Sequence, residues 1–159
     1  MILEIISIYL SRNKKIIFKN FCLKIKSSEI VTLIGRNGSG KTSLLEMIVG
    51  LLKPESGAIK INSINIEEIG EGKRDQFIYI PYEDALKEDL TIYENLQIWA
   101  NLASVNLSKE LFEKSLDYFS LSEIKNVLVG KLSQGQKKKI ALTKLLLTNC
   151  SLWIFFSNF

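Results

Sequence analysis

Residues 35–42 read GRNGSGKT and match the pattern GxxxxGK[ST] at every fixed position. An apolar run, EIVTLI at 29–34, precedes this stretch, and apolar residues at helical spacing follow it. A glycine-rich turn between a strand and a helix brings backbone N–H groups and the positive end of the helix dipole against a phosphate. The sequence therefore predicts a phosphate-binding loop, with a buried strand over 29–34 and a helix that begins near Lys41 and ends at Gly50.

Each part of this loop has a chemical role in the prediction. Its glycines allow positive φ angles and a close approach of the backbone to phosphate. Lys41 is long enough to reach terminal phosphates, and the hydroxyl of Thr42 is a ligand for Mg²⁺. The predicted nucleotide-binding residues are Gly35, Arg36, Asn37, Gly38, Ser39, Gly40, Lys41, Thr42 and Ser43. On its own, the loop indicates a nucleoside triphosphate and nothing narrower.

The segments around the loop predict alternating strands and helices. The isoleucine-rich stretches 2–8 and 16–25 flank a polar turn, so we expect two antiparallel strands there. Further strands are predicted over 58–61, 76–80 and 152–156, the last of them buried. Strands that alternate with helices imply an α/β fold with a largely parallel sheet.

The pattern becomes helical between Pro81 and Lys131. Thr91 with Glu94 three residues later predicts a capping box, and a second helix is expected to begin near Ser108. A third, apolar helix, IALTKLLL at 140–147, is expected after the short polar motif LSQGQKKK. We predict a single domain over 1–159, with a nucleotide-binding core at 1–80 and 132–159 and a helical subdomain at 81–131.

Composition excludes several classes of protein. The chain has 159 residues, 47% hydrophobic and 24% charged, which suits one globular domain. No apolar run approaches the roughly 20 residues that span a bilayer. The absence of histidine excludes imidazole catalysis and His-ligated metal sites. Cys22 and Cys150 are predicted to be buried thiols and not to form a disulfide. The side chains of Lys137, Lys138 and Lys139 are predicted to form a solvated helix face.

A second motif narrows the class of protein. The segment at 132–136, LSQGQ, resembles the LSGGQ signature of ABC transporter ATPases, and it follows the loop by about ninety residues, at the start of a helix, as in that family. The N-terminal strands, the loop, LLKPESGAIKIN, the helical insertion and the signature also come in the family's order. In the family, the signature contacts the ATP held by a partner domain. The signature residues are Leu132, Ser133, Gln134, Gly135 and Gln136.

This resemblance implies an α/β P-loop NTPase sheet with N-terminal antiparallel strands and a helical insertion, incomplete at the C-terminus. Within the family, LTIYENLQIWANL, which includes Trp99, and SLWIF resemble the ATP-binding subunit of haem exporters used in cytochrome c maturation. The implied ligands are ATP and Mg²⁺. The implied partners are a transmembrane permease and a second ATP-binding domain, in a homo- or heterodimer, and no nucleic acid is implied. The resemblance also implies a peripheral protein on the cytoplasmic or organelle-matrix face of a membrane.

The chain departs from the family at its catalytic positions. Tyr82 stands where the family's Q-loop has glutamine, and 152–159 read LWIFFSNF where the family places Asp-Glu after an apolar strand. The family's later switch histidine has no counterpart. We therefore predict no intact catalytic residue. Besides a transporter ATPase, a non-hydrolysing ATP-binding structural or regulatory subunit and a truncated, inactive product remain open.

Recognition of adenine is also open at this point. The family usually stacks an aromatic side chain on the base, and Arg12 stands close to that position. Tyr9, nearby, is expected to be a strand residue packed on the sheet, whereas Phe18 could offer a stacking surface.

Overall fold

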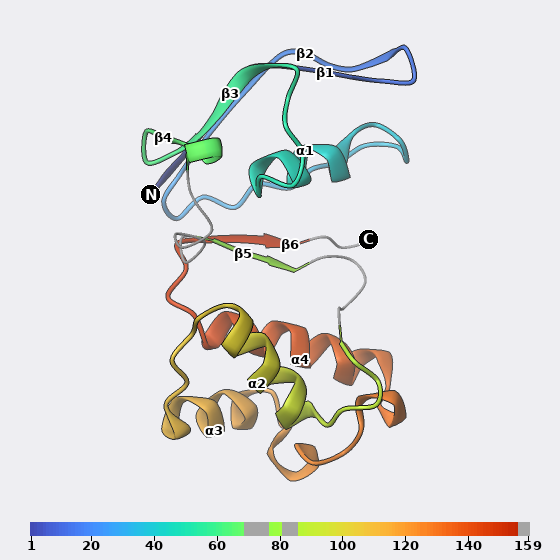
Figure 1. Cartoon of the computed structure of the whole chain (residues 1–159), viewed down its shortest axis with the longest axis vertical. Helices are drawn as coiled ribbons and strands as arrows, with labels where there is room; N and C mark the ends of the chain where they lie inside the picture. The colour runs from blue at the N-terminus through green and yellow to red at the C-terminus, as the bar shows by residue number, and fades with distance from the viewer. Residues whose placement is uncertain (69–76, 81–85, 156–159) are drawn as a thin grey trace. The chain divides into compact units, whose positions relative to one another are not determined.

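The computed structural model describes residues 1–68, 77–80 and 86–155. The chain divides into two compact units, Met1–Arg74 and Asp75–Phe159, and each is described by itself. Figure 1 shows the helices and strands of both units with their labels.

Unit 1 is built on a four-stranded antiparallel sheet with the strand order β2-β1-β3-β4. The strands are β1 (Ile2–Arg12), β2 (Lys15–Lys26), β3 (Ser56–Ile61) and β4 (Ile64–Asn65), and a short 3-10 helix, η1 (Ile66–Glu68), follows them. Asn13 and Lys14, which join β1 to β2, both have positive φ, as tight hairpin turns require. The predicted pair of N-terminal antiparallel strands is confirmed.

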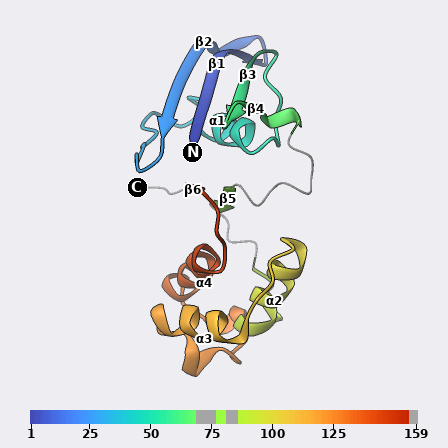
Figure 2. The same cartoon turned by 90° about the vertical axis from the view of Figure 1, so that its left-hand side faces the viewer.

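One face of this sheet is buried beside helix α1 (Lys41–Ile48), which lies along it in both views (Figures 1 and 2). The side chains of β1 are buried at Leu3, Ile5, Ile8 and Leu10. The pairing of β1 with β2 shifts in register after Ile5, after Ile8 and after Leu10. The helix contributes Leu44, Met47 and Ile48 to the buried residues. The helix that was predicted to follow the glycine-rich loop is therefore present, and Gly50, with φ 75°, directly follows its C-cap residue Val49.

The predicted buried strand over 29–34 is wrong. All six residues are described and none is in a strand, and Ile30 and Ile34 are 96% and 92% exposed. A continuous apolar run indicates burial on two faces only when neighbouring strands are present to pair with it. The sheet that contains β1 is completed by β2, β3 and β4 instead, so the segment reaches the loop as irregular chain.

Unit 2 consists of helices beside a short parallel sheet. Its helices are α2 (Ile92–Leu102), α3 (Lys109–Tyr118) and α4 (Gln134–Leu146), with 3-10 turns η3 (Ser122–Ile124) and η4 (Val129–Lys131) between the last two. The predicted capping box of Thr91 and Glu94 is confirmed, and so is the predicted start of the second helix near Ser108, which is its N-cap residue. One apolar cluster holds the helices together: Ile92, Leu96, Phe112, Leu116, Leu121, Val129, Ile140 and Leu147.

The sheet of unit 2 pairs β5 (Phe77–Ile80) with β6 (Leu152–Phe155) in parallel. Ile78, Ile80 and Ile154 are buried, and the first two pack with Ala141 and Leu145 of α4. The expectation that the last strand is buried holds only at Ile154, because Trp153 and Phe155 are 51% and 42% exposed. The predicted division into 1–80 with 132–159 and 81–131 stays a prediction.

The two cysteines differ in exposure from what was predicted. Cys22, predicted to be buried, is exposed on β2 and forms no disulfide within the described residues, while Cys150 is half-buried. Side chains alternate between the two faces of a strand, and Cys22 lies on the face of β2 opposite to the half-buried Phe21 and Leu23, which exposes it. Among the helices that the structure describes, none has the length and apolar character needed to cross a membrane.

Candidate functional site

The glycine-rich loop turns into α1 through Gly40, which is the N-cap residue with φ 99°. A Cβ placed on Gly40 would collide with Cγ2 of Ile17 and lie 3.0 Å from Cζ of Phe18. A Cβ on Gly38, where φ is 77°, would meet nothing within 4 Å. Glycine is therefore required at 40 by both backbone conformation and packing, but at 38 by conformation alone.

The N-terminus of α1 is open to an anion. Within the part of the chain that the structure describes, no side chain caps this helix and its first turn holds no acidic residue. Thr42 is exposed there, and Ser43 is buried. The first N–H groups of a helix lack partners inside the helix, so an uncapped end favours an anionic ligand. The geometry fits the predicted phosphate site.

The ammonium group of Lys41 lies over the same loop. Its Nζ donates hydrogen bonds to the carbonyl oxygens of Gly35 at 2.6 Å and Arg36 at 3.1 Å. Another bond, from Ser39 N–H to the Arg36 oxygen at 3.1 Å, closes the turn. Hydrogen bonds from an ammonium to ionised oxygens are stronger than those to neutral carbonyls, so a phosphate can compete for Lys41.

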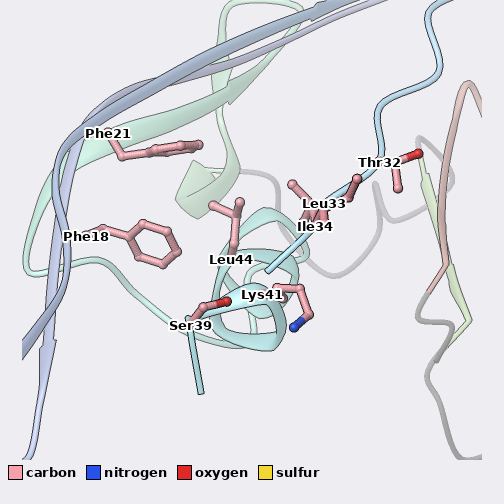
Figure 3. Close-up of a pocket in the computed structure, with 8 residues that line it drawn as sticks. All are labelled: Phe18, Phe21, Thr32, Leu33, Ile34, Ser39, Lys41 and Leu44. Atoms are coloured by element: carbon pink, nitrogen blue, oxygen red, sulfur yellow. The ribbon is translucent and has the colours of Figure 1, made fainter. Parts of the chain in front are cut away.

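A cavity of about 270 Å³ adjoins the loop (Figure 3). The rings of Phe18 and Phe21 form part of its wall, with centroids 5.4 Å apart. Sequence reasoning did not single out Phe21, although its place three residues after Phe18 on the same strand was visible. The lining residues are Phe18, Phe21, Thr32, Leu33, Ile34, Ser39, Lys41 and Leu44.

The other residues considered for adenine have structural contacts. Arg12 forms an ion pair with Glu46 of α1, with 3.6 Å between Nη2 and Oε2. Tyr9 is half-buried on β1 and lies opposite Ser56 of β3, as a strand residue would. The identity of an adenine-stacking residue stays open.

A magnesium ion at this site would depend on few protein oxygens. Thr42 carries an exposed hydroxyl beside the loop, and the described residues include no group of three Asp, Glu, Cys or His side chains that could hold a metal. Mg²⁺ in nucleotide sites keeps several waters and takes oxygens from the phosphates. The residues therefore fit Mg²⁺ bound together with a nucleotide.

The signature segment begins α4 in unit 2. The helix starts at Gln134, inside the polar motif that was expected to precede it, because Ser133 caps it there. Ser133 is the N-cap residue, and it shares a capping box with Gln136: Gln136 N–H donates to Ser133 Oγ at 3.2 Å, and Ser133 N–H donates to Gln136 Oε1 at 2.9 Å. Leu132 packs against the apolar cluster, whereas Gln134 and Gly135 are exposed. The segment thus has a fixed backbone and an exposed polar surface.

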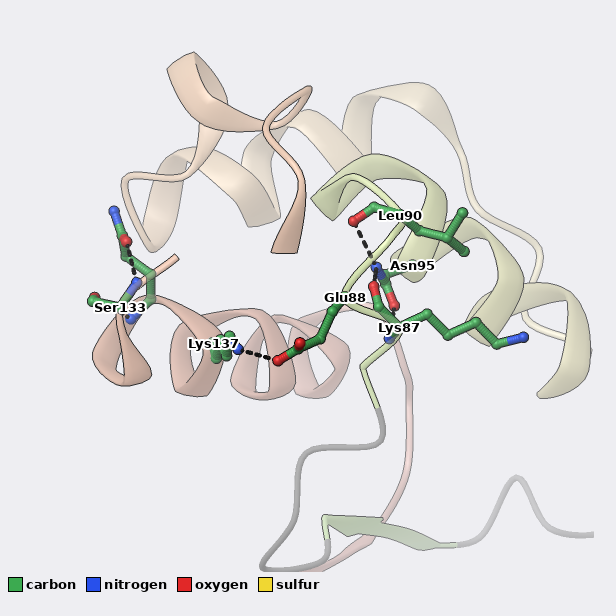
Figure 4. Close-up of polar contacts among 7 residues, drawn as sticks. Lys87, Glu88, Leu90, Asn95, Ser133 and Lys137 are labelled. Atoms are coloured by element: carbon green, nitrogen blue, oxygen red, sulfur yellow. Dashed lines mark hydrogen bonds and ion pairs between the residues drawn. The ribbon is translucent and has the colours of Figure 1, made fainter. Parts of the chain in front are cut away.

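Polar contacts connect the first turns of α4 to the loop that precedes α2 (Figure 4). Lys137 Nζ lies 2.7 Å from Oε1 of Glu88, and the Lys137 side chain is only 14% exposed. The prediction of a solvated lysine face is therefore wrong at Lys137, because a carboxylate distant in the sequence reaches it. The hydrogen bond from Lys137, reinforced by its charge, lowers the pKa of Glu88 below its ordinary value.

Some predicted site residues are not brought together here. The P-loop residues lie in unit 1 and the signature in unit 2, and the two units are described separately. Tyr82, the predicted Q-loop position, and the last four residues of the sequence lie outside the described residues.

The comparison with protein families defines the class. Residues 18–155 match the family model for ABC transporters. The chain therefore belongs to the ABC transporter family, and it is an ATP-binding subunit by the likeness of its sequence and fold to such subunits.

Among its curated relatives is the cytochrome c biogenesis ATP-binding export protein CcmA of Wolbachia pipientis wMel, 33% identical over 152 residues, which are 96% of this chain and 72% of that protein. The CcmA of Reclinomonas americana is 39% identical over 145 residues, 90% of this chain and 64% of the relative. These relatives confirm the predicted resemblance to the subunit used in cytochrome c maturation.

Solved structures confirm the predicted α/β nucleotide-binding fold. An ATP-binding subunit of an ABC transporter matches 98% of this chain at 30% identity with a TM-score of 0.83, and the match covers 65% of that structure. An ABC transporter ATP-binding protein from Pyrococcus furiosus matches 98% of the chain at 26% identity, also with a TM-score of 0.83, over 74% of its own length. The chain is thus shorter than these proteins, spanning about two thirds to three quarters of their length.

Proposed function

We propose that this chain is the ATP-binding subunit of a haem exporter for cytochrome c biogenesis. The observation that carries the proposal is the sequence GRNGSGKT at the open N-terminus of α1, in a chain whose curated relatives include the CcmA export proteins described above. Its partners would be a transmembrane permease and a second ATP-binding domain, on the cytoplasmic or organelle-matrix face of the membrane.

Nucleotide binding would use the P-loop residues from Gly35 to Ser43. Backbone N–H groups and the first turn of α1 would receive the phosphates, and Lys41 would exchange the carbonyl oxygens of Gly35 and Arg36 for the oxygens of the terminal phosphates. Thr42 would hold Mg²⁺, which supplies positive charge against the phosphate oxygens. The apolar cavity beside Phe18 and Phe21 supports a ligand with one apolar face.

Coupling to the permease would go through a dimer. In this arrangement the P-loop of one subunit faces the signature segment of the other, so ATP bridges the two. Ser133 and the exposed Gly135 suit a phosphate contact, because both lie at the start of α4, where the helix dipole is positive.

Hydrolysis by this chain is expected to be slow. Residues 152–159 contain no carboxylate, and Tyr82 replaces the Q-loop glutamine, so the groups that would orient water and support Mg²⁺ are missing from the sequence. General-base help alone is typically worth about 10²–10⁴-fold in rate. This observation favours a second candidate function, an ATP-binding subunit that dimerises without turnover.

Phosphate release from the purified chain with Mg-ATP tests the catalytic part, with Lys41→Ala as the contamination control. We expect turnover far below 1 s⁻¹. A rate on the order of 1 s⁻¹, typical of competent enzymes, that vanishes in the control would contradict the expectation of slow hydrolysis.

Co-purification in detergent with the permease of a cytochrome c maturation system tests the assignment to haem export. Binding to an unrelated permease in its place would argue against that assignment.

A further inference from the structure

Glu88 is bonded to both sides of the signature segment 132–136. Its main-chain oxygen accepts a hydrogen bond of 2.9 Å from the N–H of Gly130, two residues before the segment. Its carboxylate accepts a hydrogen bond of 2.7 Å from Lys137, the residue directly after the segment (Figure 4). One residue thus fixes the chain on entry to the signature and on exit from it.

The contact on the entry side depends on glycine at position 130. A Cβ on Gly130 would lie 3.2 Å from the main-chain oxygen of Glu88 and 3.3 Å from its Cβ. These distances are shorter than ordinary van der Waals contacts, so a side chain here would push the two segments apart. The neighbouring bond from Val129 N–H to the Leu90 oxygen, 2.9 Å, holds the same two segments together.

Glu88 is itself held in place by a buried side chain. Asn95 of α2 is 6% exposed, and its Oδ1 accepts a hydrogen bond from Lys87 N–H at 2.8 Å. Its Nδ2 donates to the main-chain oxygens of Lys87, Leu90 and Thr91 at 2.9, 3.3 and 3.0 Å. The loop is therefore bonded to the buried amide on either side of Glu88, and buried amides that are fully hydrogen-bonded fix backbone geometry.

The ion pair is unequal in exposure, and this argues for a role in orientation. The Glu88 side chain is 68% exposed but that of Lys137 only 14%. Ion pairs between fully exposed side chains contribute little to stability. Here the lysine side chain is largely covered and its ammonium bonds to one carboxylate, so the pair ties the first turns of α4, where Ser133 and Gly135 lie, to the loop before α2.

We propose that Glu88 is a positioning residue that sets the orientation of the signature segment for its contact with nucleotide bound by a second subunit. The proposal rests on the proposed function for the existence of that contact. It predicts that loss of the Glu88 carboxylate weakens ATP-dependent dimerisation without changing nucleotide binding at the P-loop, which lies in the other unit.

The test is Glu88→Gln in the full chain. Three quantities are measured: the affinity for Mg-ATP by calorimetry, the ATP-dependent dimer dissociation constant by analytical ultracentrifugation, and the melting temperature. We expect dimerisation to weaken by about tenfold, as for the loss of one charge-assisted hydrogen bond, with ATP affinity unchanged. The exchanged pair, Glu88→Lys with Lys137→Glu, should recover most of the loss. Glu110→Gln is the matched control, since Glu110 pairs with Lys114 on α3 at 2.7 Å, away from the signature.

Unchanged dimerisation in Glu88→Gln, an equal loss in Glu110→Gln, or no recovery in the exchanged pair would overturn the proposal. If the wild-type chain binds ATP but does not dimerise, the proposed function fails, and amide hydrogen exchange then decides on Glu88 separately. Faster exchange of the Gln136 and Lys137 amides in Glu88→Gln than in wild type supports the positioning role. Equal exchange contradicts it.

Discussion

The N-termini of α1 and α4 differ in how their first backbone N–H groups are satisfied. The glycine-rich loop precedes α1, whereas α4 begins within the signature segment, and both helices begin with N–H groups that lack partners within the helix. At α4, Ser133 and Gln136 bond reciprocally and satisfy two of these groups. At α1, the N-cap is Gly40 in the left-handed conformation, and among the described residues no side chain takes the place of Ser133.

The difference indicates which end needs a ligand to be complete. The first turn of α4 is fixed by the chain's own side chains, so its geometry is ready before any partner arrives. The loop before α1 instead holds Lys41 on two neutral carbonyl oxygens and leaves its N–H groups open to an anion. A nucleotide should therefore stabilise unit 1 much more than unit 2.

Gly40→Ala should have the largest effect on the difference between the N-termini of α1 and α4. The left-handed conformation costs a non-glycine residue about 1–2 kcal/mol, and the new Cβ would collide with Ile17. We expect a loss of at least about 2 kcal/mol in the free energy of unfolding of unit 1, together with weaker ATP binding. Urea denaturation measures the free energy of unfolding. Gly38→Ala is the matched control, since its Cβ would meet nothing, and an equal loss there would show that packing on Ile17 is unimportant.

Lys41→Ala should weaken ATP affinity by about tenfold or more, equivalent to about 1.4 kcal/mol. The melting temperature without nucleotide should change little, because among the described residues the ammonium bonds to two exposed loop carbonyls. Titration calorimetry with Mg-ATP measures the affinity. Equal affinity in mutant and wild type would contradict the assignment of the loop.

Ser133→Ala should destabilise unit 2 by about 1 kcal/mol, the usual effect of removing an N-cap side chain. ATP affinity of the isolated subunit should be unaffected, because the P-loop lies in the other unit. Thermal unfolding monitored by circular dichroism measures the first quantity and calorimetry the second. A melting temperature equal to that of wild type would mean that the cap adds nothing and that the two helix ends do not differ as described.

The smallest expected effect is a pH dependence confined to unit 2. The pKa of Glu94 lies below its ordinary value of 4.5, because the backbone N–H of Thr91 and then its hydroxyl donate to the carboxylate. A depressed pKa in the folded state stabilises it above about pH 4.5, and this contribution is lost as pH falls through the lowered value. The difference in stability between wild type and Glu94→Gln should thus shrink from pH 6 to pH 3. A difference that stays constant over this range would argue against it.

Local patterns in the sequence were sufficient to predict the helices. The capping box of α2 involves only Thr91 and Glu94, and the start of α1 follows from the glycine-rich loop, so no distant contact had to be known. The N-terminal hairpin was predictable for the same reason. The P-loop and the signature were likewise visible as motifs, although their assigned roles stay predictions.

Features that depend on distant partners could not be predicted. The run at 29–34 has the composition of a buried strand, but strand formation depends on neighbours, and Ile30 and Ile34 are exposed. The contact of Glu88 with Lys137 joins residues 49 positions apart, and no local pattern indicates it. Cys22 is exposed because it lies on the face of β2 opposite to Phe21 and Leu23, and which face of the sheet is covered depends on the rest of the fold.

The parallel pair β5 and β6 has a consequence for how unit 2 folds. Phe77 pairs with Leu152, so the pair closes a loop that contains α2, α3 and α4. Closing so long a loop costs conformational entropy before any strand contact repays it, and such non-local pairing is slow. During synthesis, the side chains of Ile78 and Ile80 would stay exposed to solvent on the nascent chain until α4 and β6 have been synthesised. The helices should therefore form first and the sheet last.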